Sequence, residues 1–286
     1  MSRDNKGKAA VIRNIQEAVV RGDFNTKVQN GEPVLSPEEE VTILNSYLKE
    51  KNTAGFRIKN MVVTGCQQFV SCLRNIKTEY YGIHNLDGLV GIGGIITSNH
   101  FNPLENTAVL RIVKKMKRSS KLFAVSQMSN FVMPGIVGFI LRYANVIPLC
   151  RHSREYLTGR FIRQIEEITE NGDYVLIYPE QEMWYNYRKP RPLKPGAYRY
   201  AAILGLPVIS CFVEIRDEKV LMGIWNTRYI VHILPVIYPD KDLNVREAAE
   251  KMMEIDYMQK KTAYEAAYGK ALDYSFENTD IAGGMK

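Results

Sequence analysis

The sequence has few of the features that mark disulfide-rich, metal-binding or membrane-spanning proteins. Its four cysteines form no CxxC pair and have no histidine at ligand spacing, which predicts neither a disulfide framework nor a metal site. The most apolar stretch, residues 131–150, is interrupted by Pro134, Arg142 and Pro148 and does not predict a transmembrane helix. There is also no secretory signal and no glycine-rich phosphate loop. These absences favour a reducing, cytoplasmic compartment.

The composition is that of an ordinary globular protein with a basic charge balance. Of 286 residues, 45% are hydrophobic and 24% are charged, which is enough for one large α/β domain with a helical extension. The formal charge of +7 favours an anionic partner: nucleic acid, a phosphorylated substrate or a membrane surface. No nucleic-acid recognition motif accompanies the charge, so we expect no nucleic-acid partner.

Residues 1–78 form a predicted helical extension, and residues 79–286 alternate apolar strands with amphipathic helices, which is typical of an α/β domain. Ser36 and Pro37 begin a helix that reaches about residue 51. A second amphipathic helix over residues 58–76 either packs on the sheet or contacts a membrane. The segment 131–143 leaves the same two possibilities open, burial in the core or a position on a bilayer.

Residues 95–105 carry the strongest signal for chemistry. The apolar run 91–96 predicts a buried strand, and Asn102 followed by Pro103 predicts a helix that begins there. His100 would then lie just beyond the strand's carboxyl end, where α/β proteins place their active sites. Glu105, in the first helical turn, either pairs with the His100 ring or completes a capping box by accepting a backbone N–H.

Two further strands are followed by polar residues. The strand over 146–149 leads to Arg151, and the strand over 173–178 leads to Glu180. Because carboxyl ends of parallel strands share one edge of a sheet, these side chains could converge with His100. Beyond them, Arg188, Lys189 and Arg191 are expected in an exposed basic loop before Lys194.

Four blocks of residues 80–215 resemble, in order, those of the lysophospholipid acyltransferase family, which includes 1-acyl-glycerol-3-phosphate and glycerol-phosphate acyltransferases. They are Asn99–Glu105, with glutamate for the usual aspartate; Asn145–Arg151, with asparagine for glycine; Tyr178–Gln181, with glutamine for glycine, followed by Leu193–Gly196; and Leu206–Cys211, with serine for the second proline. The resemblance implies a mixed, mostly parallel sheet flanked by helices. It also implies fatty acyl transfer from a thioester to a hydroxyl of a phosphorylated lipid such as lysophosphatidic acid, in phospholipid biosynthesis.

The resemblance assigns roles to five residues. His100 is the expected general base and Glu105 orients it, while Arg151 and Lys194 would bind the acceptor's phosphate. Glu180 would hydrogen-bond acceptor hydroxyls or hold Arg151.

No cofactor or metal is expected; acyl-coenzyme A or acyl carrier protein would be the co-substrate. Because no transmembrane helix is predicted, we expect the protein to lie peripherally on the inner face of the membrane. The alternatives are a catalytically weak lipid-binding protein of the same fold, favoured by the departures in the blocks, and an acyltransferase for a non-glycerolipid acceptor.

Overall fold

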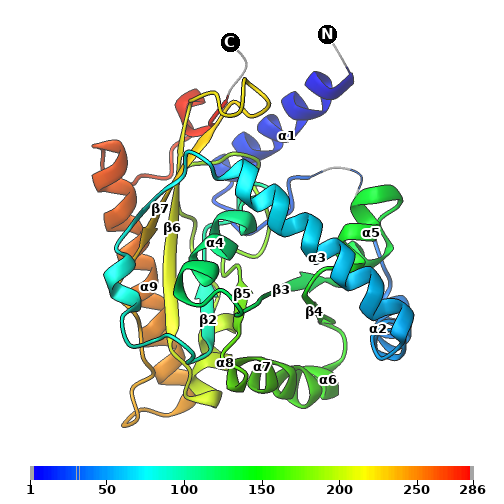
Figure 1. Cartoon of the computed structure of the whole chain (residues 1–286). Helices are drawn as coiled ribbons and strands as arrows, with labels where there is room; N and C mark the ends of the chain where they lie inside the picture. The colour runs from blue at the N-terminus through cyan, green and yellow to red at the C-terminus, as the bar shows by residue number, and fades with distance from the viewer. Residues whose placement is uncertain (1–2, 30, 32, 284–286) are drawn as a thin grey trace.

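The computed structural model describes residues 3–29, 31 and 33–283, and these are organised around a seven-stranded sheet (Figure 1). The strand order is β1-β7-β6-β2-β5-β3-β4, and every neighbouring pair is parallel except β6 and β7. The predicted mixed, mostly parallel α/β class is therefore confirmed. The strands are β1 (Glu79–Tyr81), β2 (Gly94–Thr97), β3 (Leu122–Gln127), β4 (Val146–Leu149), β5 (Tyr174–Ile177), β6 (Val208–Arg216) and β7 (Arg228–Ile233).

Helices cover both faces of the sheet, and alternate residues of each central strand face opposite sides. Ile95 of β2 and Val175 of β5 pack in one cluster with α7 and α8, whereas Ile96 and Leu176 pack in a second cluster with α4. The helices are α1 (Arg3–Val20), α2 (Pro37–Glu50), α3 (Ala54–Arg74), α4 (Asn106–Met116), α5 (Gly135–Tyr143), α6 (Arg154–Thr158), α7 (Arg160–Glu170), α8 (Gly196–Leu204) and α9 (Val245–Tyr268), with short 3₁₀ turns η1 (Ile83–Leu86), η2 (Met128–Val132) and η3 (Asn278–Asp280).

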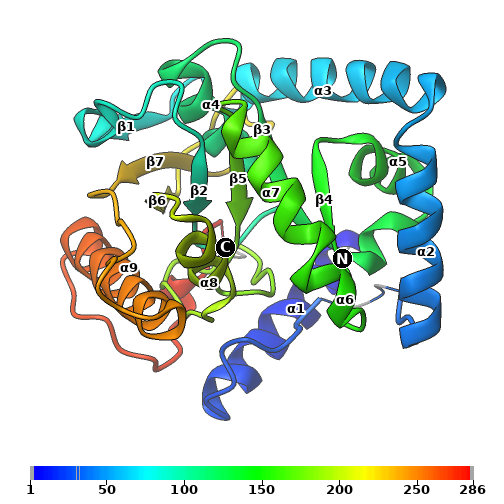
Figure 2. The same cartoon turned by 90° about the horizontal axis from the view of Figure 1, so that it is seen from below.

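The N-terminal helices frame one side of the domain. Figure 2 shows α2 and α3 meeting at an angle, with α5 inside it. The predicted cap of α2 is confirmed: the Ser36 hydroxyl accepts a hydrogen bond from Glu39 N, and the Glu39 carboxylate accepts one from Ser36 N. Within the described residues, every helix is too short or too polar to cross a membrane. The boundary at residue 78 stays a prediction.

Three local features differ from the sequence-based expectations. The helix expected to begin at Pro103 begins at Asn106, because residues 102–105 form a turn held by side-chain bonds. Ser153 as a cap and the apolar pattern through Ile168 predict one helix that ends near Asn171, but the structure breaks it at Gly159 into α6 and α7. Strand β1 was not predicted; it has three residues, too few for a period-two pattern, and forms by pairing with the distant β7.

Candidate active site

His100 follows the carboxyl end of β2 and forms a dyad with Glu105. Asn99 fixes the register: its side-chain oxygen accepts from Val213 N at 2.8 Å, and its amide nitrogen donates to Val213 O at 3.0 Å. The next residue, His100, directs its Nδ1 to the Glu105 carboxylate. Glu105 is fully buried, whereas the His100 side chain is 21% exposed. The predicted dyad is therefore present, with the acid on the inside and the imidazole reachable from solvent.

Glu105 performs both of the functions that the sequence left open. One oxygen contacts the His100 ring, while the other accepts backbone N–H groups of Phe101 at 2.5 Å and Asn102 at 2.8 Å. The Tyr178 ring stacks on His100 with centroids 3.9 Å apart. Burial, together with the neighbouring Glu105 charge and a hydrogen bond to it, holds the pKa of Tyr178 well above its usual value. Tyr178 therefore stays protonated beside the dyad's carboxylate.

A cavity of about 650 Å³ opens beside His100, a volume usual for small-molecule sites. Its polar lining residues include His100, Gln127, Arg151 and Lys194. The rest is largely apolar and lies along β3 and β4, which explains why β3 side chains stay only half-buried inside the sheet. This apolar part is lined by residues such as Met133, Val137, Leu141, Leu149, Phe161 and Ile177. The cavity thus brings the His100 imidazole and two cations together with apolar side chains.

Arg151 and Lys194 line the cavity from different segments of the chain, and their expected role in phosphate binding stays a prediction. Arg151 follows β4, is 47% exposed, and lies 3.9 Å from a Glu182 oxygen, which also accepts from Gln127 at 2.9 Å. Lys194 is exposed, and its backbone N–H donates to Pro179 O at 2.9 Å. Within the described residues its ammonium has no carboxylate partner. The sequence reasoning missed Glu182 and Gln127; Gln127 ends a strand, the same signal that identified Arg151.

Glu180 does not occupy the place expected for it. It is buried outside the cavity lining and pairs with Arg191 at 2.9 Å, while its carboxylate also accepts from His100 N at 3.1 Å and Arg191 N at 2.9 Å. The expected contact with Arg151 is wrong, since Glu182 is the carboxylate beside Arg151. The physical reason is the turn at Gln181, which sends residues 180 and 182 in different directions.

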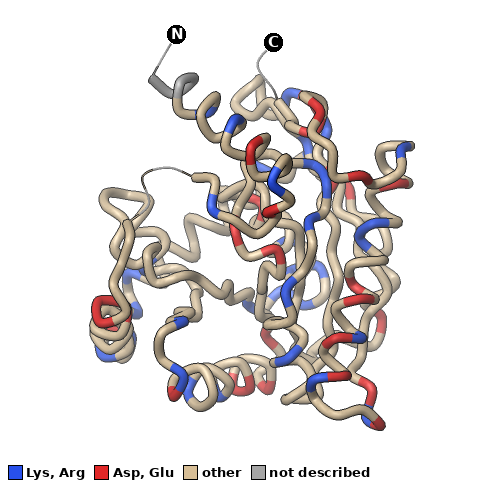
Figure 3. Tube along the Cα trace, turned by 180° about the vertical axis from the view of Figure 1, so that it is seen from behind, with Lys and Arg blue, Asp and Glu red and all other residues tan. Residues whose placement is uncertain are grey.

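The predicted exposed basic loop is also corrected. Lys189 and Arg191 are buried, and all three of its cations have acidic partners: Arg188 with Asp217, Lys189 with Asp280 and Asp273, and Arg191 with Glu180. All but Glu180 lie more than 25 residues away along the chain, so the local sequence gave no sign of them. Figure 3 shows basic and acidic residues interspersed along most of the trace.

Two of the residues that depart from the family blocks preserve local structure. Gln181 adopts φ 68°, so a non-glycine residue here takes the left-handed backbone conformation that favours the usual glycine. Ser210 joins a buried network in which its hydroxyl contacts Asp256 and lies 3.2 Å from the Lys260 ammonium. Both departures therefore leave the dyad and cavity intact.

The fold and the dyad define an α/β protein with a histidine–glutamate pair beside a cavity. Residues 77–214 match the model of the Acyltransferase family, so this part of the chain is an acyltransferase domain. No curated protein matches the chain. Among solved structures, it is similar to the crystal structure of the 1-acyl-sn-glycerophosphate (LPA) acyltransferase PlsC from Thermotoga maritima, with 13% identity, a TM-score of 0.47, and coverage of 95% of this chain and 100% of that chain.

Proposed function

We propose that the enzyme transfers a fatty acyl group from an acyl thioester to a hydroxyl of a phosphorylated lipid acceptor, such as lysophosphatidic acid. The observation that carries the proposal is the His100–Glu105 dyad at a cavity that combines Arg151 and Lys194 with an apolar lining. An acyl chain matches the apolar part, and a phosphate matches the two cations. Acyl-coenzyme A and acyl carrier protein are both thioester donors of the required kind.

His100 is the general base in this mechanism. The Glu105 carboxylate accepts a hydrogen bond from the protonated Nδ1 of the neutral His100 ring. Nε2 is then unprotonated, and within the described residues it has no protein partner. Nε2 removes the proton from the acceptor hydroxyl as its oxygen attacks the thioester carbonyl. The carbon–sulfur bond breaks, and the imidazolium returns the proton to the leaving thiolate.

Transfer is direct, with both substrates bound at once. Within the described residues, no serine, threonine or cysteine hydrogen-bonds to the His100 ring, and the pKa of Cys211 is raised to about 12 by burial. A covalent acyl-enzyme therefore lacks an activated nucleophile in this site. The cavity's contribution is to hold the hydroxyl against the carbonyl.

We further propose peripheral attachment to the cytoplasmic face of a membrane. The support is an apolar surface on α3 and α5, which pack beside each other (Figure 1). Ile58, Met61 and Phe69 are exposed on α3, and Ile136 and Val137 on α5. Val137 also lines the cavity, so the surface is continuous with the route to the apolar part. Burial of such side chains in the lipid interface favours binding by about 25 cal/mol per Å².

The test measures thiol release by the purified enzyme from palmitoyl-coenzyme A and from palmitoyl-acyl carrier protein, each with and without lysophosphatidic acid. Mass spectrometry identifies the lipid product. We expect release that depends on the acceptor and yields phosphatidic acid. Thiol release without acceptor would indicate a hydrolase, and no turnover with either donor and several phosphorylated acceptors would refute the proposal. A monoacylglycerol acceptor that works equally well would remove the assigned role of Arg151 and Lys194.

A further inference from the structure

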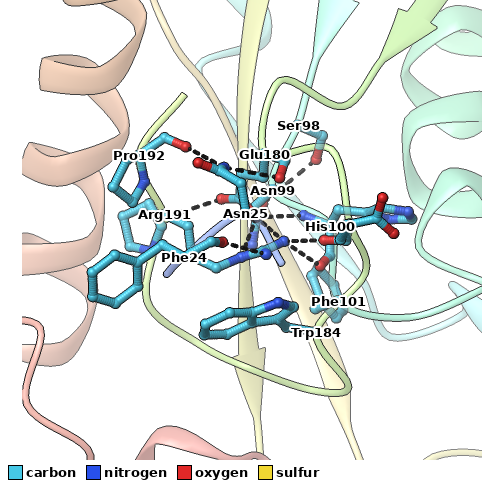
Figure 4. A network of polar contacts seen from close by, with 12 residues as sticks. Phe24, Asn25, Ser98, Asn99, His100, Phe101, Glu180, Trp184, Arg191 and Pro192 are labelled. Atoms are coloured by element: carbon cyan, nitrogen blue, oxygen red, sulfur yellow. Dashed lines mark hydrogen bonds and ion pairs between the residues drawn. The ribbon is translucent and has the colours of Figure 1, made fainter. Parts of the chain in front are cut away.

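The N-terminal segment 24–26 lies against residues that hold the His100 backbone (Figure 4). The Asn25 amide donates to Glu180 O at 3.1 Å and to Pro192 O at 2.9 Å. Phe24 O accepts from the Arg191 guanidinium at 2.9 Å, and Thr26 O accepts from the Trp184 indole at 3.0 Å. These contacts join positions more than 150 residues apart in the chain.

Glu180 and Arg191 hold the His100 backbone from both sides. The Glu180 carboxylate accepts from His100 N at 3.1 Å, and the Arg191 guanidinium donates to His100 O at 3.3 Å. Trp184 N donates to the same carbonyl at 3.0 Å. The guanidinium also lies over the Trp184 ring, 4.6 Å from its centroid. Both carboxylate and guanidinium are buried, so each depends on the other for compensation of its charge.

The Glu180–Arg191 pair, which we call the clamp, also connects His100 to the surroundings of Arg151. Arg191 donates to Glu182 O as well as to His100 O. The Glu182 side chain in turn lies beside Arg151. A shift of Arg191 would therefore move the base and the neighbourhood of Arg151 together.

We propose that segment 24–26 is a positioning element of the acyl-transfer site, which acts on His100 through the Glu180–Arg191 pair. The reason is that Asn25 and Phe24 satisfy groups of the clamp from the outside: the Glu180 and Pro192 carbonyls, and one end of the guanidinium. Segment 24–26 is not part of the cavity lining, and its bonds to Glu180, Pro192, Arg191 and Trp184 go to residues that are also outside it. Its effect is therefore on geometry and not on substrate contacts, and the kinetic part of the proposal rests on the acyl transfer proposed above.

The test compares Asn25→Leu with Asn14→Leu in the full chain. Asn25→Leu keeps the side chain's approximate shape and removes both donors. Asn14→Leu removes a bond of the same kind, from an α1 amide to Val28 O at 2.9 Å, without touching the clamp. Because a net hydrogen bond stabilises closed structure modestly, we expect amide hydrogen exchange over residues 98–102 to become about tenfold faster in Asn25→Leu alone. We also expect kcat to fall about tenfold with the acceptor KM unchanged.

Arg191→Lys provides a second variant, since it keeps the charge and loses the planar guanidinium that donates to the carbonyls of Phe24, His100 and Glu182. It should show the same faster exchange over 98–102 and the same fall in kcat. Unchanged exchange at 98–102 in both Asn25→Leu and Arg191→Lys would overturn the positioning role, whatever the activity. An equal effect of Asn14→Leu would overturn it too, because the N-terminal segment would then act only through stability. A wild type without acyl transfer would refute the proposed function, while the exchange comparison would still decide the positioning role.

Discussion

The Glu105→Gln variant gives the sharpest test of the dyad, because the structure fixes how the amide must lie. One Glu105 oxygen accepts the N–H groups of Phe101 and Asn102, so an amide NH₂ placed there would face two donors. Loss of these two charge-assisted bonds would cost about 3–6 kcal/mol. The amide oxygen therefore keeps the backbone side, and the amide nitrogen must face Nδ1 of His100.

An amide nitrogen donates to Nδ1 and stabilises the ring tautomer that carries its proton on Nε2. That tautomer cannot accept the hydroxyl proton, and the comparable change in hydrolytic triads lowers kcat about 10⁴-fold. We expect a loss of 10³ to 10⁴-fold, or about 4–5.5 kcal/mol of transition-state stabilisation. Acceptor-dependent thiol release is the assay, and exposed Glu254→Gln on α9 is the matched control. A Glu105→Gln enzyme within threefold of the wild-type kcat would refute the tautomer argument.

Three further changes have separate expected outcomes. Arg151→Ala should raise the KM for a phosphorylated acceptor about 10 to 100-fold with little change in kcat, and an unchanged KM in steady-state kinetics would count against phosphate binding there. Lys260→Met leaves a buried carboxylate unpaired and should cost about 3–5 kcal/mol in urea unfolding; a cost below about 1 kcal/mol would contradict the ion pair. Phe69→Asp with Ile136→Asp should weaken sedimentation with anionic vesicles at least about tenfold, whereas exposed Met222→Asp should not; equal binding by all would argue against the α3–α5 surface.

The sequence predicted those parts of the fold that depend on local patterns. Ser36 and Pro37 specified the start of α2, and the apolar runs gave β2, β4 and β5 within a few residues. The dyad was predictable because both of its members lie within one strand-to-turn segment. The true start of α4 was not predictable from the sequence. The Glu105 carboxylate bonds to His100 and to the backbone of the turn, and the helix begins at Asn106 instead of Pro103.

The surroundings of the dyad depend on contacts between distant segments. Arg191 looked exposed in a basic stretch, yet Glu180, Phe24 and Trp184 enclose it. The family resemblance implied that Glu180 binds acceptor hydroxyls or holds Arg151, but Glu180 is buried next to the left-handed turn at Gln181. Spacing along the chain predicts which side chains reach a sheet edge, and it does not predict which of them pair there.

The central claim is that His100 is the base of acyl transfer, and the most direct measurement compares His100→Ala with His84→Ala. His84 is an exposed histidine of η1, outside the cavity lining. Acceptor-dependent product would be measured by mass spectrometry at saturating palmitoyl thioester and lysophosphatidic acid. The account predicts a loss of at least about 10³-fold for His100→Ala and wild-type turnover for His84→Ala. Undiminished turnover by His100→Ala would contradict it.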